Sequence, residues 1–111
     1  MAMTPEGKVK ALVKKELDRR GVFHFSPAAN GFGKAGIPDI IACWRGRFIA
    51  IECKAPGKGV TGLTEPQKAR IAEIDAAGGI TAVISSDDQA SVAGQLAGMF
   101  AALRMMEAAD A

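Results

Sequence analysis

Cysteine, histidine and tyrosine are scarce in this sequence. Its 111 residues include two cysteines, one histidine and no tyrosine. Cys43 and Cys53 are too few for a disulfide framework, do not match a zinc-binding pattern, and fall on opposite faces of a predicted hairpin. His24 alternates with Phe23 and Phe25 on a short predicted strand, where a lone histidine is more often structural than catalytic. The scarcity of these residues argues against a disulfide-stapled module and a zinc module.

Long apolar runs are missing as well. No stretch approaches the roughly 18 apolar residues that indicate a membrane-spanning helix, and residues 1–20 lack the apolar core of a signal peptide. We therefore expect a soluble, cytoplasmic protein without a membrane partner. The length of 111 residues suits one domain, residues 1–111, with a single hydrophobic core.

Charge is present but unevenly spread. The net charge is +2, yet residues 1–85 carry 13 basic and 8 acidic side chains, whereas residues 86–111 carry 1 and 4. A basic half suits a polyanionic partner, although an excess of this size is weak evidence by itself.

Helical and strand signals follow in the order α-β-β-β-α-β-α. Thr4-Pro5 provides an N-cap and a proline at the first helical position, and apolar residues then recur at helical spacing until Gly21. Two glycine-rich segments, 27–36 and 56–62, predict loops. Strands are expected at 22–26, 37–44, 47–54 and 80–85, and further helices between Thr64 and Gly78 and from 89 to about 106.

The second and third strands read as a hairpin whose register can be counted. If Arg45-Gly46 is a two-residue turn, Asp39 faces Glu52 across the strands. Alternation then gives two mostly apolar faces, so we expect helices on both sides of the sheet. A bulge at Gly46 would shift this register by one residue, and the sequence leaves that alternative open.

Two carboxylates facing each other across a strand pair need a chemical explanation. Their Cβ atoms lie about 4.5–5.5 Å apart, so the charges repel unless a cation sits between them. Mg²⁺ takes one or two carboxylates and keeps several waters. Lys54, two residues after Glu52, points to the same side, where it can position a water or stabilise charge on a phosphate. The alternative is a surface ion-pair triad at the open end of the hairpin.

These residues resemble a known nuclease signature. Pro38-Asp39, twelve intervening residues and Glu52-Cys53-Lys54 are similar to the PD-(D/E)XK motif. Further matches resemble the VRR-NUC branch, the virus-type replication-repair nucleases: Thr4-Pro5-Glu6, Asn30-Gly31, Gly36-Ile37-Pro38-Asp39, residues 51–56, and Leu63-Thr64 followed by Gln67. The resemblance covers about residues 4–86. It implies a restriction-endonuclease-like α/β/α core around a mixed four-stranded sheet.

The resemblance also implies roles for particular residues. Asp39 and Glu52 would bind Mg²⁺ or Mn²⁺ together with the backbone carbonyl of Cys53, and Lys54 would be the catalytic lysine. Glu6 would be the acid of the first helix that completes the metal site. Glu16 points to the packed side of the same helix, so the sequence does not decide between the two acids.

Other candidate residues each have a simpler reading. Gln67 would join the catalytic set, yet Thr64-x-x-Gln67 is also a capping box, and both roles stay open. In the two glycine-rich loops, Asn30, Lys34 and Lys58 are candidate DNA contacts, because glycines let the backbone approach phosphates closely.

The function implied is that of a divalent-metal-dependent DNA endonuclease. The family suggests branched DNA, such as a four-way junction or flap, cut by a homodimer in a bacterial or phage-infected cell. Nothing resembles a recognition helix or zinc finger, which favours substrate shape over sequence. The alternatives are an RNA or sequence-specific nuclease on the same core, or a non-catalytic nucleic-acid-binding module. Clustered acids beside phosphates argue against the last.

Overall fold

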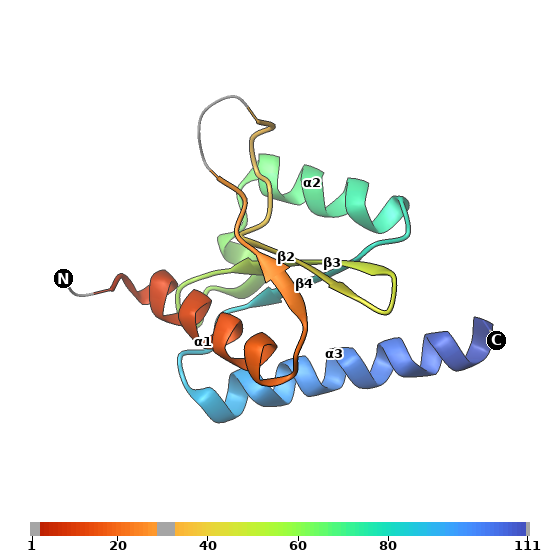
Figure 1. The fold of residues 1–111 in the computed structure, drawn as a ribbon. Helices are drawn as coiled ribbons and strands as arrows, with labels where there is room; N and C mark the ends of the chain where they lie inside the picture. Colours follow the sequence, from red (N-terminus) through yellow and green to blue (C-terminus); the bar gives the residue numbers. More distant parts are fainter. Residues whose placement is uncertain (1–2, 29–32, 111) are drawn as a thin grey trace.

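The computed structural model describes residues 3–28 and 33–110 as a four-stranded sheet with helices on both sides (Figure 1). The element order α-β-β-β-α-β-α is confirmed. The elements are α1 (Pro5–Arg19), β1 (Phe23–Phe25), β2 (Ile40–Trp44), β3 (Arg47–Cys53), the short 3-10 helix η1 (Gly59–Gly62), α2 (Glu65–Ala76), β4 (Ile80–Ile84) and α3 (Gln89–Asp110).

The sheet is mixed, and its strands lie in sequence order, β1-β2-β3-β4. The pairs β1–β2 and β2–β3 are antiparallel, whereas β3 and β4 are parallel and are joined by the crossover through η1 and α2. Trp44 pairs with Arg47, as the counted register predicts. Both turn residues have positive φ, 50° at Arg45 and 80° at Gly46, which is the geometry of a two-residue hairpin turn. No bulge shifts the register.

The hydrophobic core lies between one face of the sheet and the pair α1 and α3 (Figure 1). Trp44 packs edge-on against Phe100 of α3, with ring centroids 5.4 Å apart. The largest fully buried apolar side chains are Phe100, Leu17, Ile40, Ile49, Ile51, Ile84, Leu96 and Leu103. They come from both helices and three strands, so the carboxylate end of the hairpin is held on a rigid base.

Helix α2 covers the opposite face only in part. It packs on β4, while Phe23, Phe25 and Phe48 remain 68%, 49% and 47% exposed. The expectation of helices on both sides is therefore correct, but the β1 side of this face stays open to solvent. Cys53 is buried and Cys43 is exposed, and both thiols are free.

Two element boundaries differ by three residues or more from the sequence-based expectation, and the other strand ends differ by at most one residue. Strand β2 was expected from residue 37 but begins at Ile40, because the Asp39 carboxylate takes the Cys53 N–H that a continuing strand would bind. Helix α3 was expected to end near Met106 but continues to Asp110, since alanine, methionine and glutamate favour the helix and no glycine or proline ends it. Within the described residues, no helix is both long and apolar enough to cross a bilayer.

Candidate active site

Asp39 and Glu52 meet at the end of the hairpin away from its turn. Glu52 is the next-to-last residue of β3 and is only 2% exposed, and Asp39 immediately precedes β2. Asp39 Oδ2 accepts a hydrogen bond of 2.8 Å from the Cys53 N–H, which fixes its carboxylate against β3. The two carboxyls lie close enough that Asp39 acts on the pKa of Glu52. The structure thus brings together the two acids that the register places opposite each other.

The carboxyl pair is electrostatically strained. Burial, and then the neighbouring Asp39 carboxyl, raise the pKa of Glu52 to about 9. Glu52 Oε2 is buried and has no hydrogen-bond partner in the described part of the chain. A buried acceptor oxygen without a donor, beside a second carboxyl, is an environment that a cation would relieve.

The donor set at this point fits a hard divalent cation. Among residues 3–28 and 33–110, no group of three or more His, Cys, Asp and Glu side chains is placed to hold a metal. Zinc sites usually need three or four such ligands, whereas Mg²⁺ accepts one or two carboxylates and retains waters. Burial raises the pKa of the Cys53 thiol to about 12, so it stays protonated, and only the Cys53 main chain reaches the carboxylates. Asp39 and Glu52 therefore suit Mg²⁺ or Mn²⁺.

Lys54 lies at the same end of the hairpin and is 9% exposed. Its N–H donates to the Ile84 carbonyl at 2.9 Å, which continues the β3–β4 pairing by one residue. Its side-chain carbons pass close to Gly62 of η1, where an added Cβ would lie 3.6 Å from Cδ. Its Nζ is 4.0 Å from Glu6 Oε1. The ammonium thus lies beside the first turn of α1, and its charge opposes the rise in the pKa of Glu52.

The two acids of α1 occupy different environments. Glu16 is buried, and its carboxylate accepts hydrogen bonds from Arg19 Nε at 2.9 Å and Arg20 Nε at 2.7 Å. The hydrogen bond to Arg19 is the main cause that lowers the pKa of Glu16 to about 2. Ten residues separate the acids, about 15 Å along a helix. Glu6 therefore lies beside the candidate site, next to Lys54, and Glu16 belongs to an ion-pair cluster at the other end.

We expect Glu6→Gln to affect mainly the cleavage rate and Glu16→Gln to affect mainly the stability of the fold. Glu6→Gln should slow cleavage about 10–100-fold, as outer-shell changes at metal sites do, and leave the melting temperature nearly unchanged. Glu16→Gln should cost about 1–2 kcal/mol of stability through its lost hydrogen bonds to arginine, with cleavage retained. Cleavage rates and thermal melts of both variants measure this, and equal mild effects on cleavage would show that Glu6 only caps α1.

Gln67 has a structural function that the geometry makes plain. Its Oε1 accepts from the Thr64 N–H at 2.9 Å, and its own N–H donates to Thr64 Oγ1 at 3.3 Å, which completes the predicted capping box. Gly36 rests on the same helical turn with φ of 81°, and a Cβ there would overlap the Pro66 backbone and Gln67 N. Gln67 thereby holds the helix end on which the loop leading to Asp39 rests. A direct catalytic role for Gln67 remains a prediction.

The candidate DNA contacts lie in different places. Lys34 is exposed and its Nζ lies 3.4 Å from Glu73 Oε1 of α2. Lys58 is exposed at the start of η1. Its side chain and that of Lys54 both approach Gly62. Asn30 lies outside the described residues. Both lysines therefore flank the carboxylate end of the sheet from different segments.

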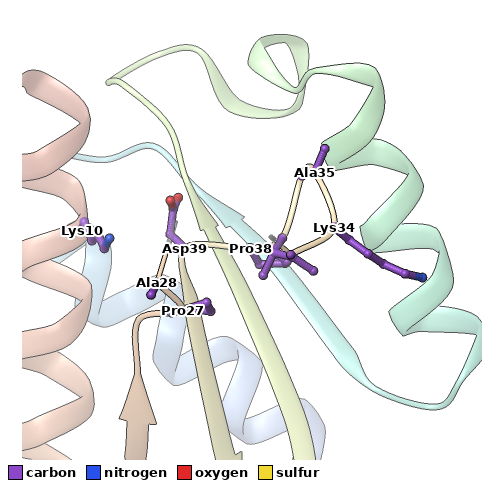
Figure 2. A pocket seen from close by; sticks show the side chains of 10 residues that line it. Lys10, Pro27, Ala28, Lys34, Ala35, Pro38 and Asp39 are labelled. Atoms are coloured by element: carbon purple, nitrogen blue, oxygen red, sulfur yellow. The ribbon is translucent and has the colours of Figure 1, made fainter. Parts of the chain in front are cut away.

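Lys10 is a basic residue of the site that the sequence analysis missed. A pocket of about 600 Å³ is lined by Lys10 of α1 together with Lys34 and Asp39, among others. Figure 2 shows Lys10 on the helix side of this pocket and the Asp39 carboxylate on the sheet side. The available signal was spacing, because Lys10 follows Glu6 by four residues and so shares its helical face.

The raised pKa of Glu52 predicts how stability depends on pH. The folded state binds a proton up to about pH 9, whereas an unfolded glutamate releases it near its ordinary value of 4.5. The folded state therefore binds more protons between these values, and the free energy of unfolding should fall as pH rises from 5 to 9. Metal-free melting curves should show this decline, and Glu52→Gln should flatten it. Glu16 has a lowered pKa, so it changes the pH dependence of the free energy of unfolding only below about pH 4.5. An equal slope in wild type and Glu52→Gln would contradict the prediction.

Comparison with known proteins adds nothing to this geometry: no protein-family model matches the chain, and no curated protein is significantly similar to it.

Proposed function

We propose that this protein is a divalent-metal-dependent DNA endonuclease related to the VRR-NUC branch of the PD-(D/E)XK nucleases. The observation that carries the proposal is the buried Glu52 carboxyl beside the half-buried Asp39, with an unpartnered Glu52 oxygen and Lys54 at the same end of the hairpin. A structural ion-pair triad would be fully paired and exposed, whereas here Glu52 is buried with an oxygen that has no partner among the described residues. Such an arrangement costs stability and is understandable where it serves catalysis.

Each residue has a defined part in this proposal. Asp39 and Glu52, with the Cys53 carbonyl, would hold Mg²⁺ or Mn²⁺, which when bound supplies Lewis acidity toward a phosphate oxygen and acidifies a water. The Glu52 carboxyl gives up its proton on binding, since metal ligands must be deprotonated. The Lys54 ammonium offers three donors to a water or to the charge that develops on the phosphate. Glu6, 4.0 Å from Lys54 Nζ, orients that ammonium.

The substrate proposed is branched DNA, cut by a homodimer. Lys10 and Lys34 line one pocket with Asp39, and Lys58 lies near the Lys54 side chain; such lysines suit contact with phosphates and not with base edges. A two-fold symmetric pair of sites would match two strands of a junction.

Cleavage assays on defined DNA substrates test the proposal. Purified protein with Mg²⁺ or Mn²⁺ should cleave a flap or four-way junction faster than linear duplex, and EDTA should stop the reaction. Matched RNA strands serve as the control for sugar preference. Binding without any cleavage would favour a non-catalytic module, and undiminished cleavage in EDTA would rule out the metal-dependent mechanism.

A further inference from the structure

Two exposed phenylalanine rings on β1 have no role in the core. Phe23 and Phe25 point to the face opposite α1, since His24 between them turns toward α1 and bonds Asp18. They are 68% and 49% exposed. Their ring centroids lie 6.2 Å apart with the planes tilted by 58°, so neither ring covers the face of the other. Two adjacent open aromatic faces are costly to leave in water and indicate a binding surface.

This aromatic pair lies on the same face of the sheet as the candidate active site. Phe25 pairs with Ile41 and Phe23 with Cys43. Ile41 is two residues after Asp39, and residues two apart on a strand share a face. Phe25 is therefore displaced from Asp39 by one strand and by about 7 Å along the sheet, equal to about two base steps of B-form DNA. A strand bound at the carboxylates would pass within reach of both rings.

Basic groups border the same face along the edge of α2. Lys34, from the β1–β2 connection, and Arg70 of α2 both pair with Glu73, at 3.4 and 2.6 Å. One acid thus faces two cations. Arg70 Nε is also buried without a hydrogen-bond partner among the described residues. Figure 2 shows the Lys34 side chain extended along α2, beside the segment that leads to Asp39. Of these groups, Lys34 lies nearest the aromatic pair, because it lines one pocket with Asp39 and with Pro27, which is two residues after Phe25.

We propose that Phe23 and Phe25 form a stacking platform for unpaired nucleotides. Aromatic rings beside cationic groups are the usual surface for single-stranded nucleic acid, because every base offers a π-face and every linkage a charge. The inference rests on the proposed function, which places the cleavage point at Asp39 and Glu52. It narrows the proposed substrate to DNA with an unpaired strand beside that point. A flap satisfies this requirement, whereas a fully base-paired junction does not. A second copy of the chain is the other occupant to test, but it would leave the cationic border unexplained.

Tryptophan fluorescence gives a direct test. Trp44 is the only tryptophan and lies on the opposite face against Phe100. In the Phe25→Trp variant, an oligothymidine in EDTA should quench the new fluorescence by stacking. The wild type, with Trp44 alone, is the matched control and should show little change. Quenching only in the variant supports the platform; equal quenching in both, or none in either, overturns it.

Conservative variants separate stacking from general hydrophobic contact. The double change Phe23→Leu and Phe25→Leu should weaken oligothymidine binding at least about fivefold per ring, while the corresponding tyrosine double variant should retain it. Met105→Leu, on exposed α3, controls for a change of apolar surface elsewhere. Equal binding by all variants, or a leucine variant that changes only the oligomeric state, overturns the platform and in the second case indicates a dimer surface.

Cleavage separates this inference from the proposed function. With Mg²⁺, the leucine double variant should lose its preference for a flap over linear duplex but keep its basal duplex activity. Stacking without cleavage of any substrate would support the platform and count against the nuclease. Cleavage with an unchanged flap preference would support the nuclease and overturn the platform.

Discussion

Asp39→Asn and Glu52→Gln will each abolish metal-dependent cleavage while the protein stays folded. The expected loss is at least about 10³-fold, because a bound metal ion supplies several kcal/mol of transition-state stabilisation. Both substitutions keep the shape of the side chain. Asn at position 39 still offers an oxygen to the Cys53 N–H, so the 2.8 Å contact that closes the hairpin end survives.

Thermal melting with and without metal separates binding from folding in these variants. Wild-type protein should gain stability on addition of Mg²⁺ or Mn²⁺ by mass action, and the two variants should gain much less. Without metal, Glu52→Gln should melt at or above the wild-type temperature at pH 8, because the wild type must keep Glu52 protonated at a pH where the unfolded glutamate is ionised. Glu16→Gln is the matched control and should keep its metal response. A normal metal-induced shift in both site variants would place the metal elsewhere.

Lys54→Ala is expected to bind DNA and metal but cleave at least about 10²-fold more slowly, the typical cost of removing one preorganised donor. Asp39 and Glu52 remain in this variant, and metal affinity should hold or rise because a competing cation has been removed. If Lys54 only neutralised the carboxylates, the loss would appear in metal-free stability and not in the chemical step.

Single-turnover rates beside a binding titration distinguish these possibilities. Lys58→Ala is the matched control, since Lys58 is an exposed lysine on the neighbouring 3-10 helix. It should weaken DNA binding moderately and leave the single-turnover rate at saturating enzyme unchanged. A Lys54→Ala protein that cleaves at the wild-type rate, or fails only because DNA no longer binds, would show that Lys54 is not catalytic.

The fold could be predicted where local chemistry decides it. The Arg45-Gly46 turn fixes the hairpin register, and Thr4 and Thr64 mark the starts of α1 and α2 with side-chain caps. The ends of elements depended on contacts that sequence patterns do not encode. Strand β2 begins only at Ile40, because the Asp39 side chain accepts from the main chain of a residue fourteen positions away.

The charged residues of the hairpin could be predicted from the sequence, whereas the residues around them could be predicted less well. Asp39, Glu52 and Lys54 follow from one hairpin count, because strand alternation is rigid. The choice between Glu6 and Glu16 required the packing of α1, which pairs Glu16 with Arg19 and Arg20 and leaves Glu6 near Lys54. The exposure of Phe23 and Phe25 depended on how far α2 extends across the sheet, a tertiary property.

Strand order also has a consequence for how the molecule folds. Each strand pairs with its neighbour in sequence, so Asp39, Glu52 and Lys54 all come from residues 39–54. A hairpin closes in about 1–10 μs, and at that moment the carboxylates still face water, where repulsion is weak. The repulsion grows only when β4 and the helices exclude that water. The free-energy cost of burying the two carboxyls therefore arises in the last packing steps. Ionisation of the pair should speed unfolding more than it slows the formation of the hairpin.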